Sequence, residues 1–507
     1  MPFRFALVVG VAILSGFGFG VALANAAEAD VIDIGARREL FLDLRLIDSF
    51  TGVRHVLQLP RDEGPVLARD EAWEDERPSI VFGTILRDGD RYRMYYRGHH
   101  GGAEITCLAE SPDGRTWTKP KLGLIERGGT RDNNIVLDDQ LLTHNFAPFI
   151  DENPAAPPEE RYKAIAGAPR NSKADPKTTG PRALVSADGL HWRLKQEMPV
   201  LSMATVLASL EGLREAMLFD SQNVVFWSTM ERRYVMYFRV YKDGLRRVAR
   251  AESDDFVNWT NLELVEYGDG AAGPGLVQDL YITQLSPYYR APHQYVGIGA
   301  RLLSKAERRI VTDEQAAAMQ LDMRQAHGLS DAVLMSSRGG PTIDRPFMEG
   351  FLRPSERLED WVARSNYPMR NIVPTGPLEM SFYVQHHNGQ PSAHVRRHSL
   401  RIDGFTSLQA PYSGGEIRTK PLKFAGRRLL LNFATSAAGD ISVELQDAAG
   451  RPIPGFALAD AVKTVGNELQ RAVRWKSGDD VSPLAGRSVR LRIVMRDADL
   501  YAFRFGE

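Results

Sequence analysis

Four acidic side chains stand close to the start of short apolar segments along the chain. They are Glu74, Asp220, Asp279 and Glu379. Two carboxyl groups a few ångströms apart can split an acetal bond, because one protonates the leaving oxygen while the other acts as base or nucleophile. Each of the four is equally well explained as a carboxylate that caps a strand or orders a loop. Their catalytic role therefore depends on whether the fold brings two of them together.

Other residues at the same segment starts suit the binding of a sugar. Aromatic rings stack on pyranose faces, and an arginine holds a carboxylate or sulfate with two parallel hydrogen bonds. The predicted substrate is a carbohydrate, with acidic or sulfated forms included. The residues expected to bind it are Trp73, Arg77, His144, Asn145, Gln222 and Tyr281.

Two histidine pairs, His99-His100 and His386-His387, raise the question of a metal site. Adjacent residues on an extended strand point to opposite faces, so neither pair can chelate one ion as a unit. The single cysteine, Cys107, lies in a strand-like segment where a buried, unreactive thiol is expected. We therefore predict no metal and no other cofactor.

A repeated phrase positions these side chains. Residues 111–117, 186–192 and 253–259 each begin with Ser, carry Asp at the third position and end in Trp, which is hairpin-turn chemistry after a β-like run. A tyrosine-bearing strand precedes each phrase, and two weaker copies of the unit follow. Each copy has the content of four antiparallel strands. Five such copies predict an all-β fold, a five-bladed β-propeller.

The chain is predicted to contain two domains after its N-terminal segment. A length of 507 residues exceeds what one ordinary hydrophobic core serves. The propeller is expected over residues 35–410, with a helical insertion at about 304–328. Alternating strands and turns over residues 411–507 predict a C-terminal β-sandwich.

The first residues predict export. An uncharged apolar run follows Arg4, and small residues then lead to Glu28, which is typical of a cleaved signal peptide over residues 1–26. An uncleaved membrane anchor is the alternative, because the run is long enough to span a bilayer. The expected location is secreted or periplasmic, with no membrane contact after cleavage.

The charge balance argues against one class of partner. The chain has 63 Lys and Arg against 64 Asp and Glu, a net charge of −1. Binding to nucleic acid regardless of sequence needs a basic surface, so no nucleic-acid partner is expected. We expect the protein to be a monomer.

Five repeats behind a signal peptide and before a C-terminal sandwich resemble the five-bladed propeller glycoside hydrolases of the invertase, levanase, arabinanase and β-xylosidase type. The chain also resembles secreted bacterial proteins known only as glycosyl-hydrolase-like, through residues 39–43 and 401–405. The resemblance implies a glycoside hydrolase that cleaves a poly- or oligosaccharide with paired carboxylates at the channel mouth. It also implies an acid in blade two, where this chain has His144 and Asn145 instead.

Two other functions stay open from the sequence. The missing blade-two acid is consistent with a non-catalytic glycan-binding propeller. A polysaccharide lyase would use Tyr281 or His144 as a base while an arginine neutralises a uronate.

Overall fold

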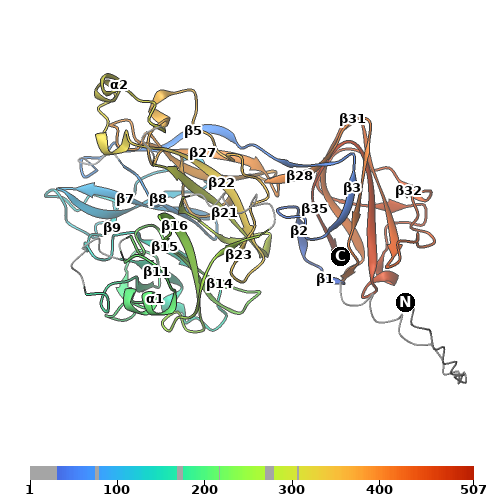
Figure 1. Cartoon of the computed structure of the whole chain (residues 1–507), viewed down its shortest axis with the longest axis horizontal. Helices are drawn as coiled ribbons and strands as arrows, with labels where there is room; N and C mark the ends of the chain where they lie inside the picture. The colour runs from blue at the N-terminus through green and yellow to red at the C-terminus, as the bar shows by residue number, and fades with distance from the viewer. Residues whose placement is uncertain (1–30, 75–78, 168–174, 216, 269–278, 305–307) are drawn as a thin grey trace, which may run out of the picture.

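The computed structural model describes residues 31–74, 79–167, 175–215, 217–268, 279–304 and 308–507. Figure 1 shows two lobes of β-strands, joined by strands that pass between them. The predicted signal peptide, residues 1–26, lies outside the described residues. In the described ranges, no helix is both long enough and apolar enough to span a bilayer.

The larger lobe is a ring of five antiparallel sheets. The first three blades each use four strands in chain order, from the inside of the ring outward. Blade one contains β6 (Thr84–Asp88), β7 (Arg91–His100), β8 (Ala103–Ser111) and β9 (Ile135–Leu137). Blade two contains β10 (Ala147–Ile150), β11 (Tyr162–Ala166), β12 (Arg182–Ser186) and β13 (Arg193–Leu194). Blade three contains β14 (Val224–Ser228), β15 (Arg233–Lys242), β16 (Leu245–Ser253) and β17 (Thr260–Leu264).

The last two blades have divided inner strands. Blade four contains β19 (Leu280–Ile282), β20 (Ser286–Tyr288), β21 (Ala291–Leu303) and β22 (Leu329–Ser337). Blade five contains β24 (Tyr367–Pro368), β25 (Val373–Pro374), β26 (Glu379–His386) and β27 (His394–Arg401), with β5 (Arg61–Ala68) outermost. Because β5 comes from the N-terminal side of the chain, its pairing with β27 closes the ring (Figure 1). The predicted five-bladed propeller is confirmed.

Helices are few and short. Two α-helices are described, α1 (Met203–Ser209) and α2 (Asp313–Ala318). The second lies in the stretch predicted as a helical insertion, and a capping box between Thr312 and Gln315 starts it. Single 3-10 turns and a two-stranded pair complete the propeller: η1 (Pro158–Glu160), η3 (Met323–Gln325), η4 (Leu358–Asp360), β18 (Glu266–Tyr267) and β23 (Thr342–Ile343).

The repeated Ser-x-Asp phrases are turns that connect neighbouring blades. In blade two, the Ser186 hydroxyl accepts a hydrogen bond from the Gly189 amide at 2.9 Å, and the Asp188 carboxylate accepts one from the Leu190 amide at 2.8 Å. The Gly189 carbonyl accepts a hydrogen bond from Tyr95 of blade one at 2.9 Å. The phrases therefore have a structural role in the ring and not a catalytic one, as the hairpin composition predicts.

The smaller lobe is one ten-stranded sheet around its own apolar core. Its C-terminal strands are β28 (Thr406–Ala410), β29 (Gly415–Thr419), β30 (Leu422–Phe424), β31 (Arg428–Asp447), β33 (Asn467–Ala472) and β35 (Val489–Gly506). Its N-terminal strands are β1 (Ile32–Gly35), β2 (Arg38–Leu40), β3 (Ile47–Thr51) and β4 (Arg54–Leu57). Short elements beside the sheet are β32 (Ala461–Val462), β34 (Arg474–Trp475) and η5 (Ser482–Leu484). Residues 32–57 thus pair with the C-terminal sheet and not with the propeller, which was predicted to begin at residue 35.

A buried polar contact joins the two lobes. Glu39 of β2 is 1% exposed and lies 2.8 Å from Arg338 of the propeller. The Leu40 amide and carbonyl exchange two hydrogen bonds with the Gln294 side chain of β21, at 3.1 and 3.2 Å. These contacts fix the smaller lobe against blade four.

Candidate functional site at the front mouth of the propeller

The propeller channel has two ends. We call the end where the inner strands begin the front mouth, bordered by Phe82, Asn145, Asp220, Tyr281 and Arg364. The rear mouth is the end where the same strands finish, at Arg87, Ile150, Trp227, Tyr288 and Val373.

The backbone at the front mouth is strained. Four non-glycine residues at or next to its border adopt the left-handed region: Phe82 at φ 59°, Asn145 at 58°, Phe219 at 61° and Arg364 at 64°. This conformation is unfavourable for bulky side chains and persists only where the surrounding structure enforces it. Such residues cluster at functional sites, which makes the front mouth the candidate site.

Tyr281 lies among three arginines at this mouth. The guanidinium carbons of Arg239, Arg246 and Arg364 lie 4.3, 5.1 and 5.4 Å from its ring centroid. Burial acts to raise the pKa of Tyr281, but the charges of Arg239 and Arg364 outweigh it and lower that pKa below its usual value. The phenol is therefore easier to deprotonate than an ordinary buried tyrosine.

Two of the predicted carboxylates border the same cluster. Asp279 is held tightly, since it accepts hydrogen bonds from the Arg246 amide at 2.7 Å and from the Arg246 guanidinium at 2.6 Å. Asp220 lies 3.7 Å from Arg239, and 23% of its side chain is exposed. The structure thus brings Asp220, Asp279 and Tyr281 together.

Arg239 is the unusual member of the cluster. Its side chain is 2% exposed, and none of its three guanidinium nitrogens has a hydrogen-bond partner among the described residues. Leaving buried donors unsatisfied is costly, and the cost is greater for a charged group. A planar guanidinium with open donors has the geometry that holds a carboxylate or sulfate group with two parallel hydrogen bonds.

The loop before Asp220 is pinned by side-chain amides. The Phe219 carbonyl accepts hydrogen bonds from Asn145 at 3.3 Å and from Asn223 at 3.1 Å. The Phe219 amide donates to the Arg239 carbonyl at 3.0 Å. Asn145, predicted to bind substrate, therefore positions the loop that carries Asp220.

A second charged group lies beside Asn145. Arg97 donates to Asn145 at 2.8 Å and lies 3.3 Å from Glu104, and His144 contacts Glu104 at 2.8 Å. Burial acts to raise the pKa of Glu104, but Arg97 and His144 lower it to about 2. His144, also predicted to bind substrate, is thus held by a carboxylate that stays charged.

Glu379 is wrong as a candidate for the front mouth. It starts β26, the second strand of blade five, because β24 and β25 form the inner strand instead. Its carboxylate accepts hydrogen bonds from Arg397 at 2.7 Å, Thr375 at 2.8 Å and Arg115 at 3.0 Å. These contacts make Glu379 part of the junction between blades five and one.

Glu74 and Trp73 also serve the structure of blade one. Glu74 is 2% exposed and contacts Tyr96 at 2.6 Å and Lys119 at 2.5 Å. Within the described part of the chain, none of its hydrogen bonds or ion pairs reaches the residues around Tyr281. The Trp73 indole donates to Asn134 at 2.8 Å and packs on the blade core. Arg77 lies outside the described residues.

Gln222 closes the channel and does not line a binding surface. Its amide donates to the Phe82 and Phe146 carbonyls, at 2.8 and 3.1 Å, and its oxygen accepts from Gln284 at 2.8 Å. Gln284 also donates to the Pro368 carbonyl at 3.1 Å. These two amides connect all five inner strands, which corrects the predicted role of Gln222 in substrate binding.

The described ranges contain no group of three or more His, Cys, Asp or Glu side chains that could hold a metal ion. The histidines of blade five instead make a polar cluster, in which His386 contacts Asp360 at 2.7 Å and His398 at 3.5 Å. Burial acts to raise the pKa of Asp360, but His386 lowers it to about 2.

Sequence reasoning missed three residues of the front mouth. Arg246 and Glu104 start third strands just after hairpin turns, in corresponding places of blades three and one, so strand pairing could have indicated them. Arg364 comes from a loop before β24, and its sequence carries no signal because the inner strand of blade five is only two short pieces.

Similarity to known proteins is found in the comparison of structures and not in the comparisons of sequence. No protein-family model and no curated protein matches the chain. A solved structure described only as a glycoside hydrolase is 14% identical, with a TM-score of 0.44 over 68% of this chain and 92% of its own. A thermostable family-43 glycoside hydrolase is 12% identical, with a TM-score of 0.39 over 65% and 89%. The Bombyx mori GH32 beta-fructofuranosidase is 9% identical, with a TM-score of 0.37 over 88% and 94%.

These similar structures are glycoside hydrolases, as the sequence resemblance predicts. The fold rests on the strand pairing described above, and the chemistry rests on the residues of the front mouth.

Proposed function

We propose that this protein is a secreted enzyme that cleaves glycosidic bonds of an acidic or sulfated carbohydrate at the front mouth. The observation that carries the proposal is Arg239, a buried guanidinium without hydrogen-bond partners in the described residues, set against Tyr281 and Asp220. An anionic group on the sugar would supply the acceptors that Arg239 lacks. The N-terminal sequence supports export.

Hydrolysis is the reaction that the two aspartates favour. Asp279 is oriented by two hydrogen bonds from Arg246, which suits a carboxylate that stabilises the transition state. Asp220 is the more exposed of the two and lies 3.7 Å from Arg239, which suits proton exchange with the leaving oxygen and water.

Elimination is a second candidate, favoured by the lowered pKa of Tyr281. In this reaction the Tyr281 phenolate would take the proton next to a uronate carboxylate. The glycosidic carbon–oxygen bond on the adjacent carbon would break, a carbon–carbon double bond would form, and the leaving oxygen would take a proton from water. Arg239 would stabilise the charge that develops on the carboxylate.

One assay separates these reactions. The mature protein is incubated with neutral, uronic and sulfated oligosaccharides, and new reducing ends and ultraviolet absorbance are followed together. Hydrolysis gives reducing ends alone, and elimination gives both signals.

The controls localise the activity. Asp220→Asn and Arg239→Gln are expected to lose activity, while Asp243→Asn, in the exposed hairpin turn of blade three, should retain it. Binding of an oligosaccharide without either signal would replace the proposed enzyme by a glycan-binding propeller.

A further inference from the structure

The rear mouth contains a cavity of about 290 Å³ that all five blades line. Its size is close to the lower limit of small-molecule sites, which is roughly 300 Å³. Gln284 lies at its floor and is hydrogen bonded to Gln222, which lies below the front mouth. The cavity is therefore separate from the site around Tyr281.

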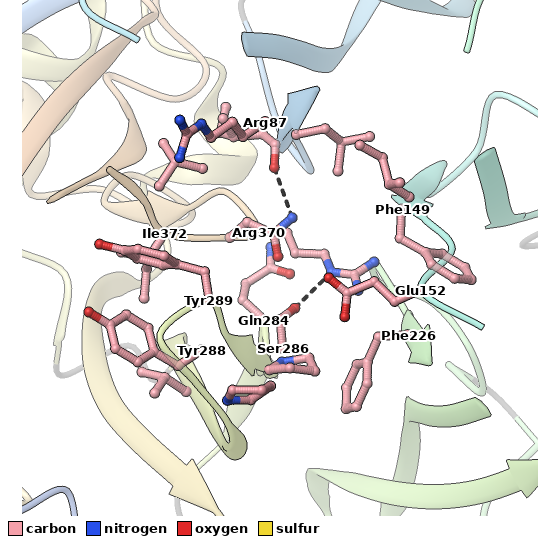
Figure 2. A pocket seen from close by; sticks show the side chains of 18 of the residues that line it. Arg87, Phe149, Glu152, Phe226, Gln284, Ser286, Tyr288, Tyr289, Arg370 and Ile372 are labelled. Atoms are coloured by element: carbon pink, nitrogen blue, oxygen red, sulfur yellow. Dashed lines mark hydrogen bonds between the residues drawn. The ribbon is translucent and has the colours of Figure 1, made fainter. Parts of the chain in front are cut away.

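Aromatic rings form two sides of this cavity. Tyr288 and Tyr289 lie on one side, and Phe149 and Phe226 lie on the other (Figure 2). Tyr289 is 40% exposed, whereas Tyr288 is buried. Rings on opposing walls are suited to a flat or pyranose ring, which gains both apolar contact and stacking there.

Arg370 lies between these walls and is 1% exposed (Figure 2). Its guanidinium donates to neutral acceptors: the Ser286 hydroxyl at 3.0 Å and the Val225 and Pro148 carbonyls at 2.6 and 3.4 Å. Within the described residues, no carboxylate lies at ion-pairing distance from it. Burial alone lowers the pKa of Arg370 to about 9, so the group is a cation at neutral pH.

A second buried arginine of the propeller, Arg250, has the carboxylate partners that Arg370 lacks among the described residues. Arg250 is also 1% exposed, but it lies between Glu231 and Glu252. Burial acts to lower the pKa of Arg250, yet Tyr237 and these carboxylates raise it overall. A buried cation is normally paired in this way, and Arg370 has no such pair.

The remaining acid at the cavity does not fill this role. Glu152 lines the cavity (Figure 2), but burial and the neighbouring Asp151 raise the pKa of Glu152, whereas a pairing arginine would lower it. The field of Arg370 therefore still favours an anion inside the cavity.

We propose that the rear cavity binds a small molecule that carries one carboxylate on a ring. The ring lies between the tyrosine and phenylalanine walls, and the carboxylate lies toward Arg370. Two sources share this chemistry: a uronic acid monosaccharide and an aromatic acid.

Calorimetry of the full mature protein distinguishes these sources. Sodium glucuronate and sodium 4-hydroxybenzoate are titrated separately, with glucose and 4-hydroxybenzamide as their uncharged counterparts. At least one acid is expected to bind at least tenfold more tightly than its counterpart. No binding of either acid, or equal binding of acid and counterpart, would overturn the proposal.

Two substitutions with opposite expected effects on affinity test whether the ligand lies in the rear cavity. Glu152→Gln removes a negative charge from the cavity wall and is expected to tighten binding several-fold. Tyr289→Ala removes an exposed ring and is expected to weaken it about tenfold. These variants replace Arg370→Gln as the test, because Arg370 contacts several blades and its loss could prevent folding.

A front-mouth variant is the matched control. Asp220→Asn should leave the affinity for the acid within twofold of the unaltered protein. Loss of binding in Asp220→Asn together with normal binding in Tyr289→Ala would place the acid at the front mouth and refute the rear site.

Discussion

The two mouths of the propeller channel each contain a buried arginine, but the arginines are satisfied differently. Arg239 at the front mouth has no hydrogen-bond partner among the described residues and stacks on Tyr281. Arg370 at the rear mouth donates to the Ser286 hydroxyl of blade four and to backbone carbonyls of blades two and three. The front arginine is thus open to a ligand through its donors, whereas the rear arginine acts mainly through its charge.

The residues around the two arginines also differ between the front and rear mouths. The front mouth combines arginines with aspartates, which is typical of a site that carries out chemistry. The rear mouth has a cavity lined by tyrosine and phenylalanine rings, which is typical of a site that only binds. Inner strands that run through both mouths can therefore support two functions, because strand starts and strand ends carry different residues.

The largest effect is expected from Asp220→Asn. If the front mouth alone is catalytic, glycosidic cleavage should fall about 10²- to 10⁴-fold, the usual range for loss of a general acid or base. Initial rates on the preferred oligosaccharide measure this. Asp243→Asn makes the same chemical change in an exposed turn of blade three and should retain full activity. Equal rates for Asp220→Asn and the unaltered protein would remove the distinction between the mouths.

The next effect concerns the amides that separate the mouths. Gln222→Leu leaves the Phe82 and Phe146 carbonyls and the Gln284 amide without their partner. We expect a loss of about 3 kcal/mol of unfolding free energy, since each unsatisfied buried group costs roughly 1–3 kcal/mol. A thermal melt measures it. Gln196→Leu, whose amide makes a surface contact with the Met198 carbonyl, should melt normally. Normal stability of Gln222→Leu would argue for a ligand-binding role instead.

Lowering the pH should change the contributions of Glu104 at the front mouth and Glu152 at the rear mouth to folding stability in opposite directions. Because the folded-state pKa of Glu104 is lowered to about 2, its charge stabilises the fold above pH 4.5, and this contribution disappears as the pH falls toward 2. The pKa of Glu152 is raised, so its charge destabilises the fold at neutral pH.

Glu104→Gln should therefore cost about 2 kcal/mol at pH 7 and progressively less in acid. Glu152→Gln should stabilise slightly at pH 7, with no effect once the native Glu152 is protonated. Denaturant unfolding at several pH values measures both variants. A loss of stability in both at pH 7 would contradict the assigned environments.

The smallest effect is a shift in a pH profile. The charge of Arg239 helps to lower the pKa of Tyr281, so Arg239→Gln should raise that pKa. Spectrophotometric titration of the phenol, with Tyr281→Phe to identify its signal, measures the shift. If Tyr281 is the base, the alkaline rise of the remaining activity should move to higher pH by the same amount. An unmoved titration would show that Arg239 does not control this phenol.

Several features of this protein were predictable from local sequence. The Ser-x-Asp turns at residues 111–117, 186–192 and 253–259 and the tyrosine strands before them predict blades, because hairpin chemistry and strand alternation act over a few residues. The starts of the inner strands in blades two to four follow from the same repeat. The repeat therefore predicts Asp220, Asp279 and Tyr281 at strand starts, among a larger set that also contains Glu74 and Glu379.

Only the tertiary structure decided which polar residues share a site. Glu379 and Glu74 have the same local sequence character as Asp220, yet long-range pairing places Glu379 at the junction of blades five and one and Glu74 against Tyr96 and Lys119 in blade one. The closure of the ring by β5, the addition of β1 to β4 to the C-terminal sheet, and the approach of Arg364 to Tyr281 join residues far apart in the chain. Such contacts depend on how whole blades pack, which no short stretch of sequence encodes.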